Sequence, residues 1–417
     1  MSTRPGTPRL LRQLNDRAAL ELLLSGGPLT RAELGERTGL SKVTAGQLLA
    51  RLEERALVAV VGEQAGGRGP NAALYGVVPS CAYVVGLDVL PGRVAAGIAD
   101  ITGTIVAEVS ADFGEHDDPV RLVRGAVGRA CASAGIAAER LRAFVIGTRG
   151  VVDPATGDVR FSLDLPSWHN GVLAELRRGL GVPVTIENDV NLAALAERAY
   201  GAARDVDDFV LVWAGVGQGL GVMLGGRLHR GFTGGAGEIG WLPVPGEPLP
   251  TDVSEPQSGS FQRLVGGDAV TGLASAHGIG STRDAGSAHD IGSAHGAGPA
   301  QGGGSALVED PVASPGEYVR AAVEEGAEAF LDELAGRLAV GVAAVTVILD
   351  PGLIVLSGDV GRAGGETLAS RVQECVARVC PSRPRVVVSG VGGNPVLRGA
   401  LVLALQQARE QVFSDTV

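Results

Sequence analysis

Short apolar runs alternate with helical stretches from residue 83 onward, and this alternation constrains the fold more than any other feature. The apolar runs predict strands at 83–89, 95–100, 105–110, 143–146, 182–186, 209–212, 219–224, 346–348, 354–356 and 385–388. Apolar residues three and four positions apart predict helices at 119–134, 170–180, 190–200, 316–345, 365–378 and 395–412. This mixed order predicts an α/β fold in which helices cover the faces of the sheets.

The first 75 residues differ in charge from the rest of the chain. They hold ten basic and seven acidic side chains, which gives a net charge of +3. Because the whole chain has a net charge of −11, the remaining residues carry −14. DNA phosphates would repel such an acidic body, whereas a basic head can approach them. A chance excess of arginine in the head explains the charge equally well, so the helical pattern has to decide.

The basic head has the pattern of a helix-turn-helix. A first amphipathic helix is expected over 10–24, where the recurring apolar residues are Leu11, Leu14, Ala18, Leu20, Leu22 and Leu24. Thr30 and Glu33 form a capping-box pattern that opens a second helix over 31–37. After the tight turn Thr38-Gly39-Leu40, Ser41 caps a third helix that runs to about Arg55. Two helices joined by such a turn place the second helix in the major groove of DNA.

The third helix and a following hairpin supply the predicted DNA contacts. Val43, Leu48, Leu49 and Leu52 are expected to face inward, which leaves Lys42, Thr44, Ala45 and Gln47 near the base edges. Strands at 57–61 and 73–77 flank a glycine-rich wing whose arginine can enter the minor groove. The predicted DNA-binding residues are Ser41, Lys42, Thr44, Gln47, Arg51 and Arg68. The alternative is a small interaction domain without DNA binding.

Four motifs in the body occur in a fixed order. They are Gly147-Thr-Arg-Gly-Val-Val-Asp-Pro-Ala-Thr-Gly157, Asp164-Leu-Pro-Ser-Trp168, Glu187-Asn188-Asp189 followed by Asn191 and Ala196-Glu197, and Gly234-Gly-Ala-Gly-Glu238-Ile-Gly240. At these motifs the sequence resembles the ROK family, whose name stands for repressor, open reading frame and kinase. The resemblance covers nearly the whole chain, and four motifs in order are more specific than one glycine loop.

The resemblance implies a winged helix-turn-helix followed by a two-lobed, actin-like or RNase H-like sugar-kinase domain. It places the head at 1–78 and the ROK domain at 79–417. Lobe 1 spans about 79–200 plus the helix 395–412, and lobe 2 spans about 201–394 with a low-complexity insertion at 275–312. In that fold the two lobes enclose a sugar. By resemblance the sugar-binding residues are Gly150, Asp164, Asn188, Asp189, Glu238 and Gln262.

Asp189 stands at the family's base position, where an aspartate takes a proton from the sugar hydroxyl that attacks ATP. A simpler interpretation is that Asn188 and Asp189 cap the helix that begins near Val190. Carboxylates and amides suit sugar recognition because they accept or donate hydrogen bonds to neighbouring hydroxyls. Both roles are compatible, and the ligand contact is the stronger interpretation.

The phosphate loops depart from the family pattern. The first loop reads Asp88-Val-Leu-Pro-Gly92 where the family has aspartate-x-glycine-glycine-threonine, and the second reads Trp213-Ala-Gly215 where it has glycine-threonine-glycine. Phosphoryl transfer depends on backbone loops that approach the phosphates closely, and Leu90 and Pro91 obstruct this approach. The sequence therefore predicts no catalytic residue and no kinase activity.

The family's zinc ligands are also missing. Trp241 stands where a histidine ligand is usual, and Val253, Glu255 and Ser260 stand where thiolates would. Tetrahedral zinc needs soft or imidazole ligands, so we expect no metal and no other cofactor. The histidines of the insertion, His277, His289 and His295, are loosely spaced in a stretch that cannot bury a core, so a mobile insertion is favoured over a metal site.

These observations predict a cytoplasmic transcriptional regulator, a repressor that binds double-stranded operator DNA and senses a sugar or sugar derivative. A homo-oligomer, dimer or tetramer, is expected because operator half-sites lie about one helical turn apart, ~34 Å. The sequence has scattered cysteines, no secretory signal and no uninterrupted apolar stretch, so no membrane partner is expected. The alternatives are a ROK sugar kinase with a DNA-binding head and a ligand-blind DNA-binding dimer. The sugar, the operator and the role of the insertion are left open.

Overall fold

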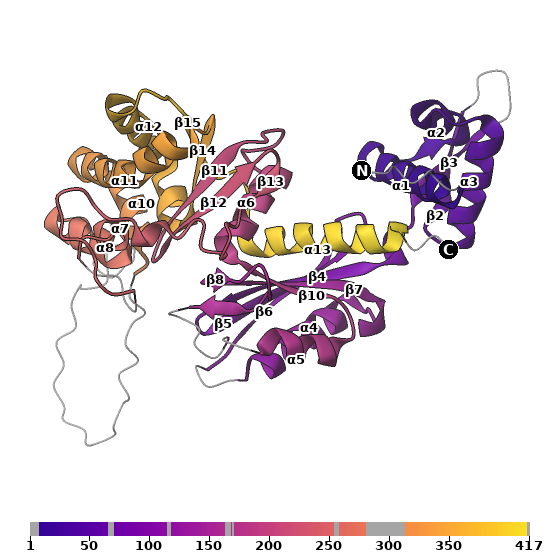
Figure 1. Cartoon of the computed structure of the whole chain (residues 1–417), viewed down its shortest axis with the longest axis horizontal. Coiled ribbons are helices and arrows are strands. Elements are labelled where there is room, and N and C mark those ends of the chain that lie inside the picture. Colours follow the sequence, from indigo (N-terminus) through magenta and orange to yellow (C-terminus); the bar gives the residue numbers. More distant parts are fainter. Residues whose placement is uncertain are drawn as a thin grey trace, which may run out of the picture. The chain divides into compact units, whose positions relative to one another are not determined.

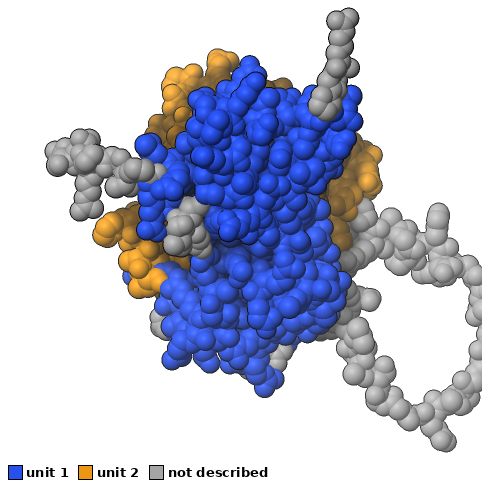
Figure 2. Space-filling view, turned by 90° about the vertical axis from the view of Figure 1, so that its right-hand side faces the viewer, with its two compact units in different colours: residues 1–150, 157–189, 396–417 blue, residues 151–156, 190–395 orange. Residues whose placement is uncertain are grey.

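The computed structural model describes residues 8–65, 71–114, 118–162, 168, 171–253, 258–280 and 313–414. The chain forms two compact units, coloured separately in Figure 2. Unit 1 comprises residues 1–150, 157–189 and 396–417, and unit 2 comprises residues 151–156 and 190–395. The units therefore divide after Asp189, whereas the sequence suggests a division of the lobes after residue 200; the domain limits at 78 and 200 stay a prediction. None of the described helices is long and apolar enough to cross a membrane.

The N-terminal part of unit 1 is a winged helix-turn-helix (Figure 1). Its elements are α1 (Pro8–Gly26), β1 (Leu29–Thr30), α2 (Arg31–Thr38), α3 (Lys42–Glu54), β2 (Val58–Gln64) and β3 (Ala72–Val77). The three strands form an antiparallel sheet in the order β1-β3-β2. Its core contains the fully buried side chains of Leu20, Leu34, Leu48, Leu49 and Leu52. The expected three helices and hairpin are confirmed.

Two details of the head differ from the expected faces. Val43 is 71% exposed and Ala45 is fully buried, so these two residues exchange the positions that the sequence suggests. Leu11 and Leu14 are also exposed, and of the six expected apolar residues of α1 only Leu20 is buried. The buried residues Asp16, Ala19, Leu20 and Leu23 recur three and four positions apart, so the face of α1 that reaches the core differs from the stripe suggested by the sequence.

The rest of unit 1 is a five-stranded sheet in the order β10-β7-β4-β5-β6. The strands are β4 (Tyr83–Leu90), β5 (Arg93–Asp100), β6 (Ile105–Asp112), β7 (Leu141–Thr148) and β10 (Val184–Asn188). Strands β4, β7 and β10 are parallel, and β4, β5 and β6 form an antiparallel meander. α4 (Pro119–Ala134) and α5 (Val172–Leu180) cover one face, and α13 (Pro395–Ser414) covers the other (Figure 1).

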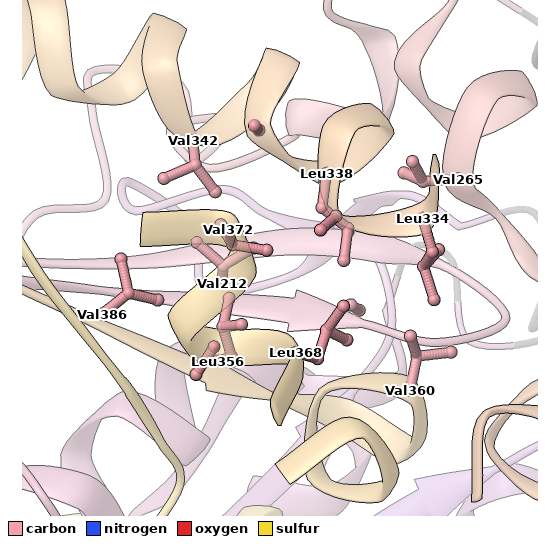
Figure 3. Packing of buried hydrophobic residues seen from close by; sticks show 14 of the residues in the cluster. Val212, Val265, Leu334, Leu338, Val342, Leu356, Val360, Leu368, Val372 and Val386 are labelled. Atoms are coloured by element: carbon pink, nitrogen blue, oxygen red, sulfur yellow. The ribbon is translucent and has the colours of Figure 1, made fainter. Parts of the chain in front are cut away.

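Unit 2 repeats this topology with a second five-stranded sheet in the order β13-β12-β11-β14-β15. Its strands are β11 (Phe209–Ala214), β12 (Gln218–Leu224), β13 (Arg227–Leu228), β14 (Leu353–Ser357) and β15 (Arg385–Val388). Its helices are α6 (Asp189–Tyr200), α7 (Phe261–Val265), α8 (Gly267–Ala276), α10 (Pro315–Glu325), α11 (Glu328–Leu349) and α12 (Gly358–Val379). Leu338 and Val342 of α11 and Val372 of α12 pack against Val212 and Leu356 of the sheet (Figure 3).

Three expected elements of unit 2 differ in the structure. The strand expected at 346–348 is wrong, because these residues complete α11, where the Thr346 hydroxyl donates to the Val342 carbonyl at 2.7 Å. The helix expected at 316–345 is two helices separated at Gly326. α12 is kinked at Gly365, where the expected helix 365–378 begins, and it carries an additional helical segment from Gly358. Thr346 is buried, whereas Val347 and Ile348 are 67% and 76% exposed, so these β-branched residues continue the hydrogen-bonded helix despite their local preference for strands. The α/β fold with a winged head is confirmed.

Candidate DNA interface and sugar-binding residues

The turn between α2 and α3 is fixed by caps at both helices. The Thr30 hydroxyl accepts from the Glu33 backbone N–H at 3.2 Å, and the Thr30 backbone N–H donates to the Glu33 carboxylate at 2.8 Å. This backbone hydrogen bond holds the pKa of Glu33 below its usual value. Gly39 ends α2 in the left-handed conformation, and the Ser41 hydroxyl caps α3 by accepting from the Thr44 N–H at 3.2 Å. The predicted capping box, turn and cap are all confirmed.

The first turns of α3 present a polar exposed face. Ser41, Lys42 and Gln47 are exposed, and Thr44 is half-buried with its hydroxyl 2.9 Å from that of Ser41. Lys42 is the only lysine of the chain. Val43 lies on the same face, a position that sequence reasoning missed because it assigned Val43 to the core together with Leu48, Leu49 and Leu52. A methyl-bearing side chain there is suited to contact thymine methyl groups.

The structure gives Arg51 a role inside the head. Its guanidinium donates to the carboxylate of Asp16 at 2.6 Å. The Asp16 side chain is 1% exposed, whereas the Arg51 side chain is 34% exposed. The ion pair joins α1 to α3. The DNA contact that the sequence predicts for Arg51 stays a prediction. Arg68 lies outside the described residues.

In unit 1, the sugar-binding residues expected around Asn188 lie at the carboxyl ends of the parallel strands. The strands β4, β7 and β10 end side by side there, because Asp88 of β4 pairs with Gly147 of β7 and Asn188 of β10 pairs with Thr148 of β7. Ligands of α/β proteins bind at the carboxyl ends of parallel strands. Asp189 follows as the first residue of α6 and is 9% exposed.

Asn188 and Gly150 are in direct contact. The Asn188 side-chain amide donates to the Gly150 carbonyl at 3.1 Å, and the Asn188 backbone N–H donates to the Glu187 carboxylate at 3.0 Å. Gly150 has a φ of +103°, and a Cβ there would collide with the carbonyl oxygen of Phe161. Only glycine therefore fits at this position. The structure brings these two predicted residues together, and Asp164 lies outside the described residues.

In unit 2, the two predicted sugar contacts have different surroundings. Glu238 lies at the start of a short 3₁₀ helix, Ile239–Trp241, and burial raises the pKa of its carboxyl. The side chain of Gln262 in α7 holds the loop after β11 by two hydrogen bonds. Its Oε1 accepts from the Gln218 backbone N–H at 3.1 Å, and its Nε2 donates to the Val216 carbonyl at 2.7 Å. Gln262 thus fixes a loop, and its sugar contact stays a prediction.

The buried carboxylate of Glu197 is the residue whose role sequence reasoning missed most clearly. It lies in α6, is fully buried, and accepts from the backbone N–H groups of Ala202 at 2.8 Å and Gly390 at 3.2 Å. It also accepts from the Val391 N–H at 3.3 Å and from the Ser389 hydroxyl. The motif identified Glu197, but nothing in the neighbouring sequence indicated that three of its partners, Ser389, Gly390 and Val391, follow 192 to 194 positions later.

The two loops that depart from the family's phosphate-loop pattern have defined conformations in the structure. Pro91 and Gly92 form a two-residue turn between β4 and β5, in which Leu90 pairs with Arg93. In unit 2, the carboxylate of Asp359 accepts from the Gly316 N–H at 3.2 Å and lies against Gly215, where an added Cβ would collide with it. Asp359 and Gly316 stand in the first turns of α12 and α10, which are positions that favour anions. The Asp359 carboxylate thus lies at the N-termini of both helices.

Comparison with known proteins identifies the body of the chain. The model of the ROK family matches residues 84–407. The chain belongs to the ROK family. Within the head, the model of the MarR family matches residues 13–69.

The curated relatives of this chain include repressors that are named for sugars. A xylose repressor of Caldicellulosiruptor bescii is 26% identical over 56% of this chain and 60% of its own length. The DNA-binding transcriptional dual regulator NagC of Escherichia coli is 28% identical over 58% of this chain and 60% of its own length. An N-acetylglucosamine repressor of Escherichia coli O6:H1 is 28% identical over 58% of this chain and 60% of its own length. The matched segments thus span about three fifths of each relative.

Solved ROK structures share the architecture. A ROK family transcriptional regulator, a homologue of the Escherichia coli Mlc protein, superposes with a TM-score of 0.72 at 19% identity and covers 97% of this chain and 98% of its own. A ROK hexokinase of Thermus thermophilus has a TM-score of 0.56 at 27% identity and covers 77% of this chain and 97% of its own. The regulator match includes the head, whereas the hexokinase match leaves about a quarter of this chain uncovered.

The residues at the zinc positions of ROK proteins do not fit a metal in this chain. Trp241 and Ser260 offer neither thiolate nor imidazole, and the Ser260 side chain is buried. Across the described ranges, no three His, Cys, Asp or Glu side chains are grouped so as to hold a metal ion. His277, assigned to the insertion, instead contacts Glu333 at 3.0 Å and the ring of Phe330; His289 and His295 lie outside the described residues.

Proposed function

We propose that this ROK protein is a cytoplasmic, sugar-responsive transcriptional repressor that binds operator DNA as a homo-oligomer. The observation that carries the proposal is the capped helix-turn-helix on a ROK body whose curated relatives include repressors named for xylose and N-acetylglucosamine. One small head rarely supplies specific affinity by itself, which favours a dimer on a palindromic site.

A mobility-shift titration tests the proposal. The full chain is titrated against the DNA upstream of its own coding sequence, with and without D-xylose and N-acetylglucosamine. We expect a salt-sensitive complex that a sugar weakens, because a ligand shifts the equilibrium only through different affinities for the two states. Equal affinity for that DNA and for unrelated DNA would contradict the proposal.

We assign DNA recognition to the exposed face of α3. Lys42, Val43, Thr44 and Gln47 reach base edges or phosphates, Ser41 fixes the first turn, and Arg68 of the wing enters the minor groove. Replacing Lys42 by alanine is expected to weaken operator binding by roughly 10- to 100-fold, because one base or phosphate contact is worth about 1–3 kcal/mol. Fluorescence anisotropy measures the affinity. Replacement of Arg129, an exposed residue of α4, is the matched control and should leave the affinity unchanged.

We assign sugar recognition to Gly150, Asn188 and Asp189 in unit 1 and to Glu238 in unit 2, with Asp164 and Gln262 as further candidates. Buried carboxylates and amides discriminate strongly between hydroxyl patterns. Calorimetry with the same sugars should show saturable heat that disappears in Asp189→Ala. Absence of heat with every sugar, together with retained DNA binding, would favour the ligand-blind alternative.

Glu238 should also reveal its role through pH. Burial raises its pKa above the ordinary value of 4.5, so the native state favours the protonated form. Its contribution to stability is therefore complete below that ordinary value and is lost as the pH rises through the native pKa. We expect Glu238→Gln to melt higher than wild type at pH 8, by a larger margin than at pH 5, and to bind sugar more weakly. Thermal unfolding checks this, with the exposed Glu247→Gln as control.

A second candidate function, sugar kinase, is favoured by the hexokinase match. We propose against it because Pro91 and the Asp359 carboxylate obstruct the regions where phosphates would bind. A coupled ATP assay across hexoses and amino sugars decides between the two. Turnover that Asp189→Asn abolishes would establish the kinase and overturn this part of the proposal.

A further inference from the structure

The long helix α13 is attached along the whole sheet of unit 1. It lies close to the sheet at Gly86 of β4, where an added Cβ would be 3.0 Å from Leu401. Farther along, the Gln407 amide donates to the Thr185 hydroxyl of β10 at 3.0 Å. Near its end, the Arg409 guanidinium donates to the Ile101 carbonyl at 2.8 Å. Such a helix moves with its sheet as one body.

The last turn of α13 contacts the DNA-reading helix. Arg55 is the residue that ends α3, and its guanidinium donates to the Val412 carbonyl at 2.9 Å. The last four carbonyls of a helix have no partner within the helix, so Arg55 supplies one of the donors that they need. The charges of the head and α13 also attract each other. The pKa of Arg17 in α1 is raised mainly by its hydrogen bond to Glu21, with a smaller contribution from the charge of Glu410 in α13.

The other end of α13 follows a loop that α6 holds in place. Glu197 of α6 accepts from the backbone N–H groups of Gly390 and Val391, four or five residues before α13 begins. α6 itself begins at Asp189, a proposed sugar contact. The chain passes between the two units at 189/190 and 395/396, which are the first residues of these same two helices. The Glu197 cluster therefore ties α6 to the loop that precedes α13, within unit 2.

We propose that Arg55 is a positioning residue that couples sugar binding to DNA binding through α13. Sugar bound at Asp189 displaces α6, Glu197 transmits the displacement to the loop before α13, and Arg55 transmits it from the end of α13 to α3. The inference rests on the proposed function, since it requires a sugar site and a DNA site. Arg55 need not touch either ligand.

The test compares the wild-type full chain with Arg55→Met, Arg55→Lys and the exposed neighbour Glu54→Gln as control. For each protein, affinity for the upstream DNA is measured with and without saturating D-xylose or N-acetylglucosamine, and the ratio of the two values is the coupling factor. Sugar affinity is measured separately by calorimetry. Coupling factors in such systems are typically about 5- to 150-fold.

We expect Arg55→Met to bring the coupling factor close to one while sugar affinity stays within about twofold of wild type, and Arg55→Lys, which keeps an N–H donor, to be intermediate. An unchanged coupling factor in Arg55→Met overturns the inference and leaves the proposed function intact. A wild-type chain that binds neither sugar nor DNA overturns both. If hydrogen exchange shows that Arg55→Met unfolds the head, the Arg55→Lys ratio decides, and a wild-type ratio there overturns the inference.

Discussion

Replacing Arg51 by methionine is expected to destabilise the winged head by about 3 kcal/mol, because it leaves the carboxylate of Asp16 buried without its cation. The Asp16 side chain is 1% exposed, and its second carboxylate oxygen has no hydrogen-bond partner among the described residues. The loss therefore includes the desolvation cost of an uncompensated charge. Hydrogen exchange of the α1 and α3 amides measures it, and a change of this size accelerates exchange by roughly 100-fold.

The double replacement Asp16→Leu with Arg51→Met is the matched control. An apolar pair of similar volume often replaces a buried ion pair at little cost, so we expect most of the lost stability to return. The experiment also separates the two roles of Arg51. If the double variant regains its stability but binds operator DNA poorly, Arg51 contacts DNA as well. Unchanged exchange in Arg51→Met alone would show that the pair contributes nothing to the head.

Replacing Glu197 by alanine is expected to destabilise unit 2 by about 2–4 kcal/mol, because it leaves the buried Val391 N–H without an acceptor, which alone costs about 1–3 kcal/mol. The less buried N–H groups of Ala202 and Gly390 lose their acceptor at the same time and add a smaller cost. Urea unfolding followed by the fluorescence of Trp213 and Trp241, both in unit 2, measures the loss.

Two further variants define the Glu197 experiment. Glu197→Gln keeps one acceptor oxygen and should lose less stability than Glu197→Ala. Glu374→Ala, on an exposed turn of α12, should unfold at the wild-type urea concentration. An unfolding midpoint of Glu197→Ala equal to that of Glu374→Ala would show that the cluster does not stabilise unit 2.

Local sequence chemistry predicted the helix-turn-helix well. The Thr30–Glu33 capping box, the left-handed Gly39 and the Ser41 cap each depend on residues at most three positions apart, and all three occur in the structure. Local chemistry failed at Val43 and at 346–348. Val43, Val347 and Ile348 are all exposed on helices, because which residues reach the core depends on the neighbouring elements, which a pattern of apolar residues does not specify.

The site shows the same division between local and long-range information. The sequence by itself determined the α/β fold and the winged head, because motifs and periodicity are written in neighbouring residues. The hydrogen bond between Asn188 and the Gly150 carbonyl, 38 positions away, was decided by the tertiary structure. Only the tertiary structure decided that Arg51 pairs with Asp16, that Asp359 lies against Gly215, and that Glu197 holds the loop before α13. These partners are 35 to 194 positions apart. A buried polar group needs a partner, but which distant residue supplies it depends on how the chain packs.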